Sequence, residues 1–392
     1  MLSPESLARF QAALAEAEVD GWLLYDFRGS NPVAQELLGV GGHITRRFFV
    51  WIPTEGVPVA ITHAIEQGVW AGWPAAWRKE RYSSWWSLES HLRRLVDGKR
   101  VAMEYSAGDA VPYLDRVPAG VVELVRNAGA TITSSGNLVT RFHAVWTDAQ
   151  LASHRRAAEI IAGIARDTLR FAGEQARHGR PAAEYDLQQR IVAAFARAGL
   201  ETDDPPNVSV GANAANPHYQ PSATQQQLVT LGNILLIDLW AREPGGVYAD
   251  QTWMAAVGAP DARALEIWTV VRDARDAALA LLRERAASRT PVRGADVDDV
   301  TRGLVQSRGY GDYFTHRTGH SIDPRDLHGS GPNLDNLETR EERLLIPGVG
   351  FSVEPGVYIP GEIGVRSEVN VYFGDGELIV TPQEYQQELM LV

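Results

Sequence analysis

The sequence has no cysteine, no long apolar run and too little positive charge for a nucleic-acid partner. The absence of cysteine excludes disulfides, thiolate metal ligands and a cysteine nucleophile. A formal net charge of −12 at pH 7 argues against nucleic acid and anionic membranes, because both bind to dense basic faces. No stretch approaches the roughly 18–20 apolar residues of a membrane span. Without disulfides or an apolar signal segment, we expect a cytoplasmic protein.

The chain is long enough for two domains. It has 392 residues, and 45% of them are hydrophobic, so it can bury a sizeable core. In residues 1–145, short β-rich runs alternate with amphipathic segments, which is typical of a small α/β domain. Ser3 as N-cap and Pro4 at the first helical position predict that a helix opens this domain. The β-rich runs cover residues 21–26, 46–53, 57–63 and 100–105.

A tryptophan-rich stretch lies between residues 70 and 86. Its tryptophans are Trp70, Trp73, Trp77, Trp85 and Trp86. One interpretation is a core helix with aromatic packing. The alternative is an exposed segment that packs on a partner, since Trp and Arg concentrate in interface hot spots. We expect a homodimer in which this stretch contributes contacts between the N-terminal domains.

Residues 146–392 are predicted to form an α+β domain. Thr147 and Gln150 have the spacing of a capping box, and apolar residues then recur at helical intervals. Because helices and strands are segregated along this part, we expect helices backing a mainly antiparallel sheet. The further helices are expected at 183–199, 261–288 and 293–308, and the strands at 234–239, 247–257, 350–359 and 364–373.

Four carboxylates interrupt the apolar strands of this domain. Asp238 follows the run ILLI, Asp250 lies within VYADQTW, Glu354 within FSVEPGVY and Glu368 within GVRSEVNVY. Taken singly, a strand acid is usually a structural hydrogen-bond acceptor. A buried carboxylate without a partner is costly or becomes protonated, so each of the four needs a compensating charge.

Metal ions would supply that compensation. Arg242 and Arg366 could pair with two of the acids, but they leave a deficit of positive charge. Two divalent cations would balance all four carboxylates, with His320 as a neutral fifth ligand. An oxygen-rich ligand set with one imidazole suits Mn²⁺ and tolerates Co²⁺ or Zn²⁺.

The order of these motifs resembles that of the pita-bread metallopeptidases. The matching segments are ILLIDLWAREPGGVYADQTW, HRTGHSIDPRDLH, SVEPGVY and GVRSEVNV, preceded by NVSVGANAANPHYQP, and the match runs from about residue 150 to about residue 385. Prolidase and aminopeptidase P are the members to which the chain is most similar. The resemblance therefore implies a pita-bread catalytic domain at 146–392, behind a smaller α/β creatinase-like domain at 1–145.

The resemblance also implies a role for each ligand. Asp250 and Glu368 would bridge two metal ions, Asp238 would complete one of them, and His320 with Glu354 the other. A metal-bridging water would be acidified to hydroxide and attack the scissile carbonyl, which one metal polarises. Glu354 would shuttle a proton toward the leaving nitrogen.

The resemblance also implies that two further histidines lie in the substrate site. His218 and His328 would donate hydrogen bonds to the scissile carbonyl and its tetrahedral intermediate. The substrate would be a small peptide with proline at its second position. A prolidase would cut dipeptides, and an aminopeptidase P longer peptides; both possibilities stay open, with prolidase favoured.

The chain departs from the family pattern after its second histidine. His328 is followed by Gly329 where the family usually has Glu, and the arginine that many prolidases carry shortly afterwards is absent. Arg366 is expected to be occupied with the metal-site carboxylates. We therefore predict that Arg46 or Arg47, in the glycine-rich stretch GVGGHITRR, binds the free carboxylate of a dipeptide. The alternative is that both are ordinary surface charges.

Two other classes of protein share this fold. A creatinase-like hydrolase uses no metal, and a non-catalytic pita-bread module binds peptides or proteins. Both lack part of the ligand set. The complete set of five predicted ligands in this sequence argues against both.

Overall fold

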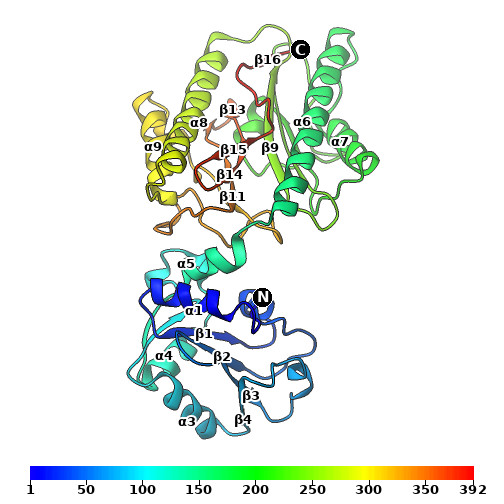
Figure 1. Cartoon of the computed structure of the whole chain (residues 1–392). Coiled ribbons are helices and arrows are strands. Elements are labelled where there is room, and N and C mark those ends of the chain that lie inside the picture. Colours follow the sequence, from blue (N-terminus) through cyan, green and yellow to red (C-terminus); the bar gives the residue numbers. More distant parts are fainter. The chain divides into compact units, whose positions relative to one another are not determined.

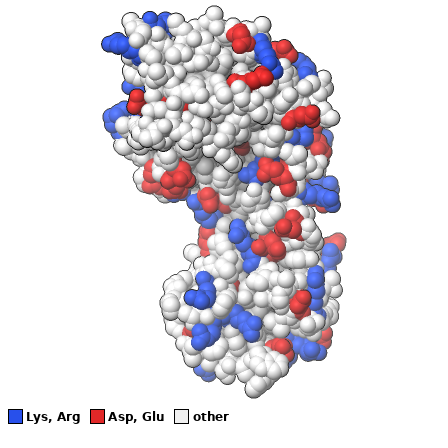
Figure 2. Space-filling model, turned by 180° about the vertical axis from the view of Figure 1, so that it is seen from behind, with Lys and Arg blue, Asp and Glu red and all other residues white.

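The computed structural model describes residues 1–392. It consists of two compact units, Met1–His143 and Ala144–Val392 (Figure 1). Lys and Arg side chains are interspersed with Asp and Glu on the face shown in Figure 2. None of the helices combines the length and the apolar character that a membrane crossing needs.

The first unit is built on one mixed sheet with the strand order β4-β3-β2-β1-β5-β6. Strands β1–β3 pair antiparallel, whereas β4, β5 and β6 each pair parallel with a neighbour. Separate apolar clusters form from alternating strand residues, and helices cover them, which confirms the α/β prediction. The strands are β1 (Gly21–Asp26), β2 (Phe48–Pro53), β3 (Val59–His63), β4 (Arg78–Tyr82), β5 (Arg100–Met103) and β6 (Thr131–Ser134). The α-helices are α1 (Leu7–Glu16), α2 (Pro32–Leu38), α3 (Trp85–Val96), α4 (Ala119–Asn127) and α5 (Gly136–Val139).

The first helix begins later than the sequence predicts. Ser3 was expected as its N-cap, but α1 starts at Leu7. The backbone N–H of Ser3 donates to Ser6 Oγ (2.8 Å) and that of Ser6 donates to Ser3 Oγ (3.2 Å). This reciprocal pair closes a turn ahead of the helix, so the hydroxyl of Ser3 caps the turn instead.

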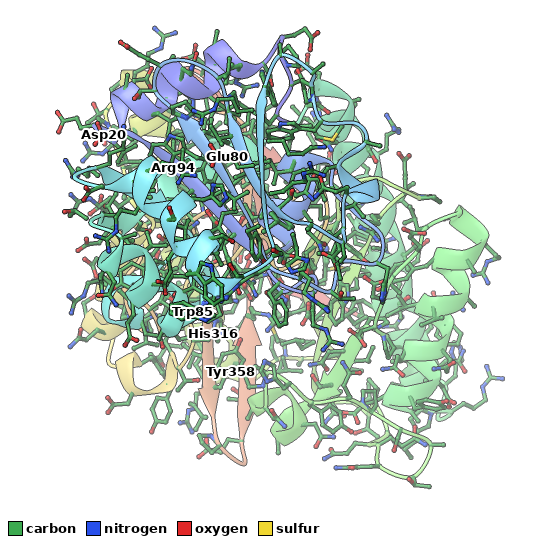
Figure 3. The ribbon with its side chains drawn as sticks, turned by 90° about the horizontal axis from the view of Figure 1, so that it is seen from below. Asp20, Glu80, Trp85, Arg94, His316 and Tyr358 are labelled. Atoms are coloured by element: carbon green, nitrogen blue, oxygen red, sulfur yellow. The ribbon has the colours of Figure 1, made fainter.

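The tryptophan-rich stretch is not a core helix, so that interpretation was wrong. It runs through a single 3₁₀ turn and strand β4 into α3. Trp70 and Trp77 are buried in the first unit's core. Trp85 and Trp86, at the start of α3, are 61% and 64% exposed, and Trp85 is labelled in Figure 3. The stretch thus divides into a buried part and an exposed pair.

The second unit combines two four-stranded sheets, β16-β9-β8-β7 and β10-β11-β14-β15, with the two-stranded β12-β13. All pairs except β16–β9 are antiparallel. The strands are β7 (Asn207–Val210), β8 (Ile234–Ala241), β9 (Ala249–Ala256), β10 (Ser321–Ile322), β11 (Val349–Val353), β12 (Gly356–Ile359), β13 (Ile363–Arg366), β14 (Val369–Phe373), β15 (Leu378–Thr381) and β16 (Met390–Leu391).

Four helices back these sheets, as the sequence predicts. Helices α6 (Asp148–Arg177) and α7 (Glu184–Ala198) share one apolar cluster with β8 and β9. Helices α8 (Ala262–Ser288) and α9 (Gly294–Ser307) share another with β11 and β14. Figure 1 shows the two helix pairs on opposite sides of the strands. The capping box of Thr147 and Gln150 opens α6, which confirms that prediction.

Two strands predicted as continuous are each broken in the middle. Residues 350–359 form β11 and β12, interrupted at Glu354-Pro355, and 364–373 form β13 and β14, interrupted at Ser367-Glu368. Strand β11 pairs with β14, whereas β12 pairs with β13, so the chain changes sheets at both breaks. Pro355 has no N–H to continue a ladder. Each break contains one of the predicted metal-binding carboxylates.

Candidate metal centre

Two of the predicted ligands lie on one face of a β-hairpin. In the antiparallel pair β8–β9, Asp238 is opposite Thr252 and Trp240 is opposite Asp250. Alternate strand residues point to the same face, so Asp238, Asp250 and Thr252 share a face. The register of the pair, in which Asp238 is opposite Thr252, therefore places both acids on this side of the hairpin.

The other three predicted ligands lie at the ends of strands in the sheet β10-β11-β14-β15. His320 precedes β10, Glu354 follows β11 and Glu368 precedes β14. The hydroxyl of Ser352 connects two of them, because it accepts the backbone N–H of His320 (2.9 Å) and donates to Glu354 Oε1 (2.9 Å). The Nδ1 atom of His320 lies 3.2 Å from the carbonyl of Ser321, so Nε2 faces the acids.

The five side chains meet in the interior of the second unit. Ligand atoms of Asp250, His320 and Glu368 all lie within 4.8 Å of one another, and the three residues are at most 5% exposed. His320 Nε2 is 3.2 Å from Asp250 Oδ2 and 3.6 Å from Glu354 Oε1. Asp238 joins the group through Arg366. The structure therefore brings the predicted ligands together, and their binding of metal stays a prediction.

Arg366 and Thr252 tie the two sheets together at the centre. The guanidinium of Arg366 forms an ion pair with Asp238, and its Nε donates to Thr252 Oγ1 (2.7 Å). Thr252 in turn donates to Glu368 Oε2 (2.7 Å). The sequence predicts Arg366 among the carboxylates, whereas Thr252 was not predicted. Its place two residues after Asp250 on the same strand was the available signal.

The centre holds more negative charge than its own cations can balance. Burial raises the pKa of Asp238 to about 7, although Arg366 opposes this, and burial together with Glu354 raises the pKa of Asp250 to about 8. Burial and Asp250 raise the pKa of Glu368 well above its usual value. Asp250 Oδ1 is buried without a hydrogen-bond partner. Buried carboxylate oxygens and one imidazole nitrogen fit a divalent cation.

Glu354 differs from the other acids. Burial alone would raise its pKa, but His320, His316 and Arg366 together hold the pKa of Glu354 below its usual value. This carboxylate is therefore ionised at neutral pH. Glu354 can therefore accept a proton at neutral pH.

The two substrate histidines lie in different surroundings. The rings of His328 and His320 are 4.3 Å apart, and His320 together with partial burial lowers the pKa of His328 to about 4, so His328 is neutral at pH 7. His218 is exposed in the segment after β7. The carbonyl of the preceding Pro217 accepts from Asn207 Nδ2 (3.3 Å), and Asn207 is paired with Asp238.

Arg46 and Arg47 belong to the first unit, just before β2. The exposed Arg46 donates through Nη1 to Thr45 Oγ1 (2.8 Å), and its backbone N–H donates to Glu66 Oε2 (3.2 Å). The carbonyl of Arg47 accepts from Tyr82 OH (2.7 Å). Their role toward a substrate stays a prediction.

Two residues beside the centre were overlooked in the sequence. His316 Nε2 lies 2.8 Å from Tyr358 OH, and Tyr358 OH lies 3.5 Å from Arg366 Nη1. Figure 3 shows His316 and Tyr358 next to each other. His316 is four residues before His320, and Tyr358 is four residues after Glu354. His316 therefore lies in the motif HRTGHSIDPRDLH and Tyr358 in the motif SVEPGVY.

The fold and the acidic centre are those of a metallopeptidase. The model of metallopeptidase family M24 matches residues 152–375, so the chain belongs to this family. The chain is similar to an Xaa-Pro dipeptidase of Lactobacillus helveticus, with 34% identity over 188 residues, 48% of this chain and 46% of that protein. It is also similar to an Xaa-Pro dipeptidase of Lactobacillus delbrueckii subsp. lactis, with 36% identity over 162 residues, 41% of this chain and 40% of that protein. The chain thus spans less than half the length of these relatives.

Solved structures resemble the whole chain. Dipeptidase PepE from Mycobacterium ulcerans matches with a TM-score of 0.70 and 21% identity, covering 99% of this chain and 97% of that chain. A prolidase from Thermococcus sibiricus matches with a TM-score of 0.63 and 22% identity, covering 100% of both chains. At these identities the likeness supports the two-part fold.

Proposed function

We propose that the protein is a metal-dependent peptidase that cleaves the bond before proline, in dipeptides in preference to longer peptides. The observation that carries the proposal is the buried cluster of Asp250, His320 and Glu368, with Asp238 and Glu354 beside it. Two divalent ions, Mn²⁺ first and Co²⁺ or Zn²⁺ as alternatives, would balance the four carboxylates. The similarity to Xaa-Pro dipeptidases supports the choice of substrate.

The chain's own residues supply the positioning and the proton transfer. When bound, the metal ions would acidify a water molecule and polarise the scissile carbonyl. Glu354, ionised at neutral pH, accepts a proton and delivers it to the leaving nitrogen. His328, neutral at the same pH, donates a hydrogen bond toward the carbonyl oxygen, and His218 serves as a second donor. These donors need no N–H from the scissile amide, so the site can accommodate a tertiary amide.

We expect hydrolysis of Met-Pro and little or none of Met-Ala in the presence of Mn²⁺. The expectation rests on the similarity to Xaa-Pro dipeptidases, and the proposed site has donors for the scissile carbonyl but needs no N–H from the scissile amide. Comparing kcat/KM for both peptides tests this, and equal rates would contradict it. Met-Pro-Ala in the same assay separates the two alternatives, because faster cleavage of the tripeptide would indicate an aminopeptidase P.

Replacing Arg46 or Arg47 with Ala is expected to weaken dipeptide cleavage selectively. A guanidinium that binds the free carboxylate contributes about 1.5–3 kcal/mol, and in a tripeptide this carboxylate lies farther from the scissile bond. The measurement is kcat/KM on Xaa-Pro and Xaa-Pro-Xaa peptides. Arg81, on the exposed strand β4, provides a matched Arg→Ala control. Equal losses on both peptides, or none, would show that these arginines are surface charges.

We expect a homodimer whose contacts include the exposed tryptophans at the start of α3. Trp85 and Trp86 are the residues to replace in this test, because both are exposed. Replacing the buried Trp77 would instead leave a cavity in the core. Light scattering at micromolar concentration should give twice the chain mass. It should give a smaller mass after both exposed tryptophans are changed to Ser. A monomeric wild type would contradict the dimer, and an unchanged dimer in the variant would contradict the role of the tryptophans.

A further inference from the structure

The segment that carries His218 has little regular structure of its own. We call residues 211–227, which connect β7 to the approach of β8, the His218 segment. It contains one 3₁₀ turn, Gly211–Ala215, and irregular chain after it. The imidazole of His218 makes no hydrogen bond, and its backbone N–H donates only to Asn216 Oδ1 (3.1 Å). Its position therefore depends on what holds the segment.

One buried carboxylate holds most of the segment. Glu184, the first residue of α7, is fully buried. Its Oε1 accepts Val210 N–H (2.8 Å) and Asn213 Nδ2 (3.0 Å). Its Oε2 accepts Asn213 Nδ2 (3.0 Å), Tyr219 OH (2.7 Å) and Gln227 N–H (2.8 Å). Every donor lies in the segment or on the residue directly before it.

Further contacts close the segment at both ends. The backbone N–H of Glu184 donates to the carbonyl of Gln227 (3.0 Å), so these two residues bond reciprocally. Gln188, one turn along the same face of α7, donates to Pro206 O (2.8 Å) and to Gln220 Oε1 (3.0 Å). Helix α7, beside α6 in Figure 1, thus presents a polar face to this segment.

The segment is held next to the metal centre. Asn207 pairs with Asp238 across β7 and β8, and its side chain donates to the carbonyl of Pro217 (3.3 Å). His218 follows Pro217 directly, and Tyr219, anchored on Glu184, follows His218. The residue before His218 is therefore held by Asn207 of β7, and the residue after it is held by Glu184.

We propose that Glu184 is a positioning residue, which fixes residues 211–227 so that His218 is presented to the substrate at the Asp238 side of the centre. This rests on the role proposed for His218 above. A carboxylate has acceptor sites for all of these donors. If glutamine replaces Glu184, its side-chain NH₂ group points toward some of these donors in either orientation of the amide. Those donors lose their partner, and the segment becomes mobile.

The test combines hydrogen exchange with a double-mutant cycle. Glu184→Gln, His218→Ala and the double variant are compared by kcat/KM on Met-Pro with Mn²⁺, and by hydrogen exchange of residues 211–227. Tyr219→Phe removes a single bond to Glu184 and serves if Glu184→Gln does not fold. Glu104→Gln is the matched control, because Glu104 is an equally buried carboxylate that accepts from Trp22, Asn31 and Ser135 in the other unit.

We expect Glu184→Gln to accelerate exchange in the segment by about tenfold or more, and to lower kcat/KM by roughly 10–10²-fold. In the His218→Ala background the same change should cost less than about threefold, because its effect passes through His218. Bound metal should remain at the wild-type level, and Glu104→Gln should change neither readout. Tyr219→Phe should produce smaller changes in the same direction.

Three results would overturn the proposal, and they distinguish its failure from that of the proposed function. If His218→Ala lowers activity but the two changes multiply independently, or if exchange in the segment is unaltered, Glu184 does not act through His218. If His218→Ala keeps full activity, the role given to His218 in the proposed function fails, and the positioning role of Glu184 fails with it.

Discussion

Replacing Glu354 with Gln is expected to lower kcat by roughly 10²–10⁴-fold, the usual loss for a general acid–base group. The variant keeps the size of the side chain and its hydrogen bond from Ser352, but it can no longer carry a proton, and without its charge it should bind one of the two predicted metal ions more weakly. Glu354 is suited to this task because its pKa is held below the usual value by His320 and His316, despite burial. The other acids of the centre have raised pKa values.

Turnover of Met-Pro at saturating Mn²⁺, together with metal content, measures this effect. Glu362→Gln is the matched control, because Glu362 is exposed and pairs with Arg263 at the surface (2.7 Å), where an ion pair contributes little. The control should retain wild-type turnover. A Glu354→Gln protein that retains most of its turnover with metal bound would show that another group transfers the proton.

Local patterns in the sequence predicted much of the second unit. The capping box at Thr147 depends only on neighbouring residues, and the α6 helix begins there as expected. The sequence also shows directly that Asp238 and Asp250 interrupt apolar strand-like runs, and the structure places both acids in the paired strands β8 and β9. These features need no knowledge of the tertiary structure.

Features that depend on distant partners were not predictable in this way. The runs around Glu354 and Glu368 have strand-like composition, so each was predicted as one strand, although Pro355 is a local signal for the first break. At the second break, Ser367 accepts a hydrogen bond from Arg275 of α8 (2.7 Å), a contact that no local pattern contains. The core-helix prediction for the tryptophan-rich stretch was wrong for a similar reason. Trp77 and Trp85 differ in exposure because of the sheet that one of them packs against, not because of their neighbours in sequence.

Removing metal with a chelator is expected to abolish hydrolysis and to destabilise the fold, more strongly at pH 8 than at pH 6. Without metal, Asp238, Asp250 and Glu368 have raised pKa values, chiefly because of burial. The folded state then holds protons that the unfolded state has released, from pH ~4, the usual carboxyl pKa, up to the pKa of Asp250 at about 8. The stability of the metal-free protein should fall as pH rises through this window.

A bound cation has the opposite dependence, because protons compete with it for the same oxygens. At a free-ion concentration of about 1,000 times Kd, binding stabilises the fold by about 4 kcal/mol, which corresponds to roughly 8–16 °C in Tm. Thermal melts with Mn²⁺ and with EDTA at both pH values measure the difference. Asp250→Asn should lose most of the gain. Full activity in EDTA, or a larger gain at pH 6 than at pH 8, would contradict a metal site built from these buried carboxylates.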